Sequence, residues 1–267
     1  MLTRTVQSAF ADLCIMDSEG DGPAVLMIHG NSSCKAVFRH QFDSPLGGRL
    51  RLIAMDLPGH GVSGDARDPA TAYTLNGYAD AAVEVLDRLG VTRATVLGWS
   101  LGGHVALNMI SRFSGLTGVM ISGTPPIDGS AEGFAQAFRQ NAHMALAGSD
   151  RWGEGDAEAY ARATAGAPFE PFMLEAARRT HNIARSTVFA AASDDQRRIV
   201  ETAPVPLAIV NGAEDAFING DYFATVAYAN LWDGRVHSLD GVGHAPFWEA
   251  PERFNPLLER FVAETAG

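Results

Sequence analysis

Short apolar runs rich in β-branched residues recur along the chain and alternate with longer stretches of helical periodicity. Short apolar runs bounded by turn residues are typical of buried strands. The predicted strands are residues 24–28, 51–55, 94–97, 119–122, 207–210 and 234–239. The predicted helices are residues 76–89, 101–113 and 251–264. This alternation predicts the α/β class, with a mostly parallel sheet covered by helices on both faces.

Two segments depart from the alternating pattern. Residues 6–16 can form an antiparallel hairpin at one edge of the sheet. Residues 124–202 contain no strand pattern and show helical patches at 134–146, 158–164 and 175–191. These patches are either ordinary packing helices or an insertion over the carboxyl ends of the strands, where open α/β sheets bind ligands. We expect the second arrangement, with a core of residues 1–125 and 203–267 and a helical cap of residues 126–202.

The charge balance restricts the class of partner. The 267 residues include 20 Lys plus Arg and 31 Asp plus Glu, so the formal net charge is −11. Lys35 is the only lysine, and no basic run occurs. Because an acidic surface repels phosphate backbones and anionic lipid, we expect neither nucleic acid nor a membrane surface as a partner. A small molecule is the expected partner.

Cysteine usage and the N-terminal residues bear on the compartment. Cys14 and Cys34 fit neither a disulfide framework nor a zinc-binding spacing, so we expect free buried thiols in a reducing compartment. Residues 1–20 lack the apolar centre of a signal peptide, and no stretch approaches the roughly 20 apolar residues of a membrane span. These features favour a cytoplasmic protein.

A Gly-rich turn separates the predicted strand 94–97 from the predicted helix 101–113. Its sequence, Gly98-Trp99-Ser100-Leu101-Gly102-Gly103, contains the pattern G-x-S-x-G. Between a strand and a helix this pattern is typical of a nucleophile elbow, where small residues permit a turn tight enough to expose the serine. The strand, the helix and the additional glycine make an ordinary Gly-rich helix start the weaker alternative. Ser100 is therefore the candidate nucleophile.

A serine nucleophile needs a histidine base that a carboxylate orients. Asp215 and His244 follow Ser100 in the order acid then base, and each comes just after a predicted strand. Because parallel strands end at one edge of a sheet, both side chains can reach the serine. Glu214 remains an alternative acid, and Asp240 is a weaker one.

Two loops after predicted strands complete the candidate site. Residues 26–33, LMIHGNSS, run from a strand into a polar loop. Backbone N–H groups of this loop, with that of Leu101 at the helix start, would stabilise the oxyanion of a tetrahedral intermediate. Alone, His29-Gly30 favours an ordinary turn at the end of a strand, whereas together with Ser100 and His244 it becomes the expected donor loop. Residues 56–63, DLPGHGVS, are typical of a rigid turn. We expect them to hold the neighbouring loops in place and not to take part in the reaction.

With these residues assembled, the chain resembles an α/β-hydrolase over nearly its whole length. More narrowly, it resembles the metal-independent N-acyl-homoserine lactonases of the quorum-quenching type. The matching stretches are HGNSS (29–33), DLPGHG (56–61), GWSLGGH (98–104), GTPP (123–126), MALAG (144–148), YAR (160–162), NLW (230–232) and GHAPF (243–247). The core motifs are common to esterases generally, whereas HGNSS, GTPP and the cap fragments are more specific.

The resemblance implies roles for individual residues. Ser100 and His244 would be nucleophile and base, and Asn31 would contact the oxyanion and the substrate. Tyr160 would be a cap residue that gates the pocket. The family can carry glutamate as the acid where this chain has Asp215, which keeps the choice between the two neighbouring acids open.

The sequence therefore predicts a serine lactonase with a Ser-His-Asp triad that opens the ring of N-acyl-homoserine lactones. We expect no cofactor and no metal, because no two histidines have the H-x-H-x-D-H spacing of the metal-dependent lactonases. A general carboxylesterase, a C–C bond hydrolase and a hydrolase-fold receptor for a lactone-like signal are the alternatives. Aromatic candidates for an acyl-chain pocket, each of which can equally be a core residue, are Trp99, Phe38, Phe134 and Phe138.

Overall fold

The computed structural model describes residues 1–187 and 194–267. Their strands form one sheet of eight strands in the order β1-β2-β4-β3-β5-β6-β7-β8. The β1–β2 and β2–β4 pairs are antiparallel and the other neighbours are parallel. The strands are β1 (Leu2–Gln7), β2 (Asp12–Asp17), β3 (Ala24–Ile28), β4 (Arg51–Met55), β5 (Ala94–Trp99), β6 (Leu116–Ser122), β7 (Leu207–Gly212) and β8 (His237–Leu239). The predicted α/β class is confirmed.

Most predicted strands are present, and the edge hairpin is confirmed as β1 and β2. The prediction of a strand over residues 234–239 is wrong in its first half, because β8 begins at His237. Before it, Asp233 and Gly234 both have positive φ within the short 3-10 helix η3 (Trp232–Gly234), so the chain turns there instead of extending.

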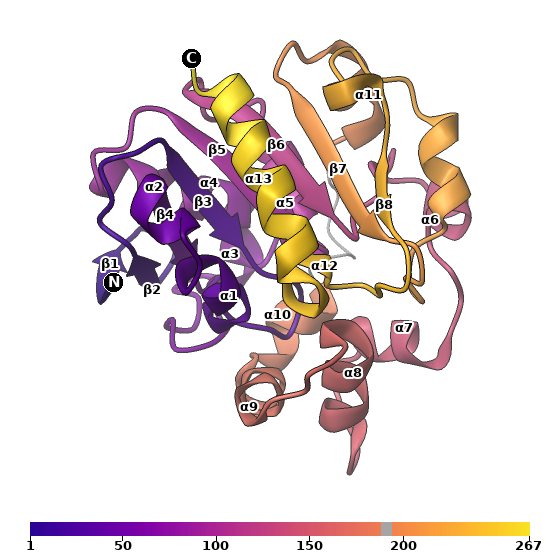
Figure 1. The fold of residues 1–267 in the computed structure, drawn as a ribbon. Helices are drawn as coiled ribbons and strands as arrows, with labels where there is room; N and C mark the ends of the chain where they lie inside the picture. The colour runs from indigo at the N-terminus through magenta and orange to yellow at the C-terminus, as the bar shows by residue number, and fades with distance from the viewer. Residues whose placement is uncertain (188–193) are drawn as a thin grey trace.

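Helices cover both faces of the sheet (Figure 1). Helices α4 (Leu75–Arg88) and α5 (Leu101–Met109) pack on one face, and α13 (Pro251–Thr265) packs on the other. Successive strand residues alternate between these layers. Thus Leu26 and Ile28 of β3 join the α4 and α5 core, whereas Val25 and Met27 join the α13 core.

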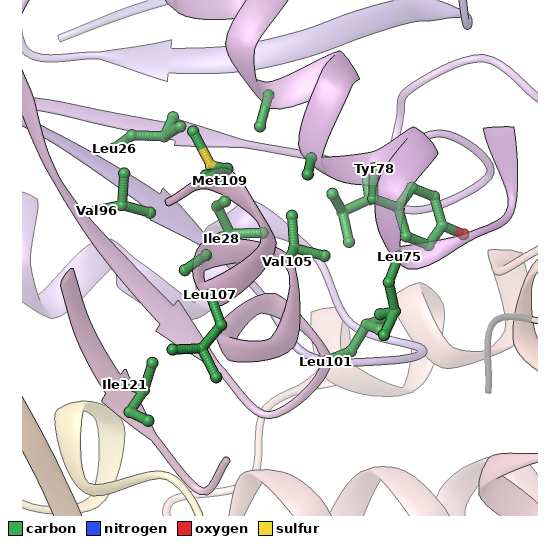
Figure 2. Close-up of a cluster of buried hydrophobic side chains, with 14 of the residues drawn as sticks. Leu26, Ile28, Leu75, Tyr78, Val96, Leu101, Val105, Leu107, Met109 and Ile121 are labelled. Carbon is green, nitrogen blue, oxygen red and sulfur yellow. The ribbon is translucent and has the colours of Figure 1, made fainter. Parts of the chain in front are cut away.

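Figure 2 shows the first of these cores, in which strand side chains meet α5 and the α4 residues Leu75 and Tyr78. Leu101 and Val105 of α5 lie there, fully buried. This packing fixes the start of α5 relative to β3 and β5, which is where the Gly-rich turn lies. The shorter elements of the core are η1 (Lys35–Phe38), α1 (Arg39–Phe42), α2 (Leu46–Arg49), α3 (Pro69–Ala72), η2 (Gly220–Thr225) and α12 (Pro246–Glu249).

The described part of the segment predicted as a cap consists of helices joined by loops. Its helices are α6 (Ala131–Ala137), α7 (Ala142–Ala147), α8 (Asp156–Ala165), α9 (Pro171–Arg179), α10 (Asn182–Thr187) and α11 (Gln196–Thr202). Figure 1 shows α7 to α10 together beyond the carboxyl ends of the central strands. Within the described residues, no helix is both long and apolar enough to cross a membrane.

Three details of the helical segment differ from the prediction. The patch 134–146 is two helices, because Phe138 is extended and Asn141 caps α7 through its side chain. The patch 175–191 is α9 and α10, and its last residues lie outside the described part of the chain. Helix α11, which was not predicted, packs against α5, where the Gln196 amide donates to Asn108 Oδ1 at 2.7 Å.

Candidate active site

Ser100 lies between the end of β5 and the first residue of α5, with φ 54° and ψ −119°. This backbone conformation costs a non-glycine residue of order 1–3 kcal/mol, so the surroundings must hold it. The Ser100 N–H donates to the Ser122 carbonyl at 2.8 Å, and the Ser100 carbonyl accepts from Thr124 Oγ1 at 2.8 Å. The turn therefore has the strained, tied geometry that the sequence pattern predicts.

The glycines beside Ser100 are required by close backbone contacts. A Cβ at Gly98 would lie 2.2 Å from the Gly102 carbonyl oxygen. A Cβ at Gly102 would lie 2.1 Å from the carbonyl oxygen of Ile28. Without side chains at these positions, the start of α5 lies against the end of β3.

His244 and Asp215 form a buried pair. Nδ1 of His244 lies 2.7 Å from Asp215 Oδ2, and the two residues are 5% and 4% exposed. Asp215 Oδ1 accepts the backbone N–H groups of Phe217 at 2.8 Å and Ile218 at 3.2 Å. Both oxygens of the carboxylate are thus engaged, and one of them fixes the orientation of the imidazole.

The neighbouring acids do not take this place. Glu214 is exposed, and its backbone N–H donates to the Val242 carbonyl. Asp240 is also exposed. The geometry therefore favours Asp215, the residue preferred from the sequence, as the partner of His244.

The loop after β3 approaches Ser100 closely. A Cβ on Gly30 would lie 3.2 Å from Ser100 Cβ. Asn31 is 4% exposed, and its Nδ2 donates to the carbonyl of Ala147 in α7 at 2.8 Å. Because its side-chain amide binds α7, the candidate oxyanion donor on Asn31 is its backbone N–H.

His29 joins this loop to the turn after β4. Its Nε2 accepts the Leu57 N–H at 3.1 Å, so Nδ1 carries the proton and donates to the Gly30 carbonyl at 2.7 Å. Burial lowers the pKa of His29 to about 4, and the ring is therefore neutral at neutral pH. Its role is to brace two loops.

The only lysine of the chain is the first residue of η1, where it is buried against the turn after β4. Lys35 Nζ lies 2.7 Å from Asp56 Oδ2, and Asp56 also accepts the backbone N–H groups of Lys35 and Val62. Burial opposes the charged ammonium, but Asp56 outweighs it and raises the pKa of Lys35. The turn thus holds loops together, as predicted. Cys14 and Cys34 are both buried and free.

A cavity of about 130 Å³ lies between the strand ends and the helical segment. Apolar side chains dominate its wall. Its lining residues are Asn31, Ser100, Phe134, Phe138, Met144, Ala147, Gly148, Tyr160, Thr164, Phe217, Ile218 and His244. Ser100 and His244 therefore open onto one apolar cavity, together with Asn31. Among the described residues, no group of His, Cys, Asp or Glu is arranged to hold a metal ion.

Some predicted pocket residues lie elsewhere. Phe134, Phe138 and Tyr160 line the cavity, and the two phenylalanine rings stack with centroids 4.3 Å apart. Trp99 and Phe38 do not line it. Both are core residues that pack against Phe247, and this corrects their prediction as acyl-chain contacts.

Several wall residues were missed as cavity residues by the sequence analysis. Met144, Ala147 and Gly148 lie in the stretch MALAG, so the motif itself was the available signal. Phe217 and Ile218 follow Asp215, and their backbone N–H groups bind its carboxylate. Because Asp215 binds both these N–H groups and His244, it holds Phe217 and Ile218 close to the histidine.

Comparisons with known proteins show which proteins the chain is similar to. The model of the Alpha/beta hydrolase family matches residues 25–257. The crystal structure of the N-acyl homoserine lactonase AidH complexed with N-butanoyl homoserine is similar at a TM-score of 0.97 and 43% identity, covering 99% of this chain and 97% of that chain. A 2-hydroxy-6-oxononadienedioate/2-hydroxy-6-oxononatrienedioate hydrolase of Pseudomonas sp is 26% identical over 93% of this chain and 91% of its own length. A pimeloyl-[acyl-carrier protein] methyl ester esterase of Xylella fastidiosa is 26% identical over 91% and 96% respectively.

Proposed function

The chain belongs to the alpha/beta hydrolase family, and we propose that within it the protein is a serine hydrolase that opens the ring of N-acyl-homoserine lactones. The observation that carries the proposal is the apolar cavity onto which Ser100 and the Asp215-bound His244 both open. An aliphatic acyl chain suits such a wall, and the reacting carbonyl is placed at its few polar groups. The likeness to AidH over nearly the whole chain supports this substrate class.

In the proposed first step, each residue of the site has its own part. Ser100 Oγ attacks the lactone carbonyl carbon while His244 accepts its proton. Asp215 holds Nδ1 and stabilises the imidazolium that forms. The carbonyl oxygen becomes an oxyanion, which the backbone N–H groups of Leu101 and Asn31 stabilise at the start of α5 and in the adjoining loop.

The second step opens the ring. The bond between the carbonyl carbon and the ring oxygen breaks, and His244 returns the proton to that oxygen. The leaving alcohol stays tethered to the acyl group on Ser100, so water activated by His244 must compete with re-closure. Attack of that water releases N-acyl-homoserine and restores the serine.

Ring opening is favoured over cleavage of the amide in the same substrate. An ester is more reactive than an amide toward a serine nucleophile, and the five-membered lactone is locked in the less stable ester conformer. Both features make the ring carbonyl the more electrophilic group. The protein is therefore proposed as a lactonase and not an acylase.

Product analysis tests the proposal. With N-hexanoyl-homoserine lactone, mass spectrometry should find one product heavier than the substrate by one water, and acidification should close the ring again. Ser100→Ala, which keeps the fold, should lower the rate by ~10⁴-fold or more. Hexanoic acid with free homoserine lactone would show an acylase instead.

Two alternatives have their own signatures. The likeness to a 2-hydroxy-6-oxononadienedioate/2-hydroxy-6-oxononatrienedioate hydrolase and to a methyl ester esterase supports a general esterase as one alternative. Such an enzyme would hydrolyse a short p-nitrophenyl ester much faster than the lactone at equal concentration. A receptor would bind the lactone without multiple turnovers.

A further inference from the structure

The segment that carries His244 is held by side chains on both of its flanks. Glu249, at the end of α12, accepts the Gly243 N–H at 3.1 Å with Oε2 and the Ala245 N–H at 3.0 Å with Oε1. Trp99 Nε1 donates to the His244 carbonyl at 2.9 Å. One carboxylate therefore binds the amides immediately before and after the base, and an indole binds the carbonyl between them.

The space around this carboxylate is fitted to it. A Cβ on Gly243 would lie 3.0 Å from both carboxylate oxygens of Glu249. A Cβ on Gly166, the residue that follows α8, would lie 2.4 Å from Glu249 Cδ. Glu249 thus also contacts the helical segment, at the end of the helix that carries Tyr160.

These bonds hold the peptide plane between His244 and Ala245 at both its N–H and its carbonyl, and they hold the plane between Val242 and Gly243 at its N–H. The direction in which its imidazole leaves the backbone follows from those planes, and the imidazole must keep Nδ1 on Asp215 while it faces the cavity. We propose that Glu249 is a positioning residue for His244: its carboxylate sets the orientation of the base. The inference rests on the proposed serine-hydrolase function of the site.

The size of the effect follows from the sensitivity of proton transfer to geometry. A misplacement of about 1 Å can cost about 10²-fold in rate. In Glu249→Gln the amide offers one acceptor, and its NH₂ group faces a backbone N–H instead of binding it. We expect kcat to fall about 10-fold to 100-fold, with KM changed less than about twofold because Glu249 does not line the cavity.

The experiment compares Glu249→Gln with Glu252→Gln, an exposed glutamate in the first turn of α13. Three readouts are taken: kcat and KM on both N-hexanoyl-homoserine lactone and a p-nitrophenyl ester, the melting temperature, and the downfield NMR signal of the His244 Nδ1 proton. The signal is assigned by its loss in Asp215→Asn. Positioning predicts lower kcat and a broadened or shifted signal in Glu249→Gln well below its melting temperature, with no change in the control.

An unchanged kcat and proton signal, with only the melting temperature lowered, would overturn the proposal and leave Glu249 a purely structural residue. Should Glu249→Gln fail to fold, Trp99→Phe removes the bond to the His244 carbonyl and is measured in the same way. A smaller loss of kcat with an altered proton signal supports the positioning of His244 by these bonds. Wild-type values of both kcat and the signal reject it. If the wild type hydrolyses neither substrate, the proposed function fails, while the proton signal still decides whether Glu249 positions His244.

Discussion

At the scale of single residues, the sequence preferred Asp215 as the triad acid but left Glu214 open. Asp215 and Glu214 are adjacent acids in one loop, and composition gives no reason to choose between them. The structure separates them, because Asp215 is bound to His244 and to two backbone amides whereas Glu214 is exposed. Consecutive residues of a turn point in different directions, and one-dimensional spacing does not contain that information.

Substitution of each acid measures this difference. Asp215→Asn keeps the shape but replaces one acceptor oxygen with a donor, so the His244 tautomer and orientation are lost. We expect a loss of kcat of about 10⁴-fold, and a change of less than about twofold for Glu214→Gln. Steady-state kinetics on folded proteins, checked by circular dichroism, would read both values. The reverse ranking would move the acid role to Glu214.

At the scale of elements, periodicity predicted the central helices because each packs a continuous apolar face. It was wrong over residues 134–146, where Phe138 leaves the helix to form a bridge with Ile218. That contact joins residues far apart in sequence, and local periodicity cannot anticipate it. In contrast, the G-x-S-x-G turn was predictable because its constraint is local: β5, the turn and α5 are contiguous.

The close approach of α5 to β3 gives a prediction at this scale. Gly102→Ala places a Cβ 2.1 Å from the Ile28 carbonyl oxygen, so the start of α5 must move away from the oxyanion loop. Overpacking of this kind costs about 1–3 kcal/mol, and we expect lower kcat as well as lower stability.

Gly48→Ala is the control, since Gly48 lies in α2 with nothing within 4 Å of an added Cβ. Alanine there should be neutral or stabilise by about 0.5–1 kcal/mol. Urea unfolding and kinetics on both variants test this, and equal behaviour would contradict it.

At the scale of the whole molecule, three buried histidines on different elements stay uncharged. Burial lowers the pKa values of His29 and His104 to about 4, and burial together with the neighbouring His29 lowers that of His60 to about 3. His29 and His60 lie with ring centroids 5.2 Å apart under the loops that shape the cavity. The sequence showed these histidines only as members of motifs and helices. Their shared burial is a property of the tertiary structure.

This burial predicts how stability depends on pH. In the unfolded chain each histidine takes up a proton as pH falls through about 6.5, whereas the folded sites stay neutral until about 4 or 3. The unfolded state then binds more protons, so stability is full above pH 6.5 and decreases below it. Each histidine should contribute a loss of about 2 kcal/mol between pH 8 and pH 5, at about 1.4 kcal/mol per pH unit below 6.5. Urea unfolding of the wild type and of His60→Asn is measured first at pH 8, where the histidines are neutral in both states, and then down to pH 5. Over this range the free energy of unfolding of His60→Asn should fall by about 2 kcal/mol less than that of the wild type. A slope equal to that of the wild type would mean that His60 is protonated in the folded protein or accessible to water.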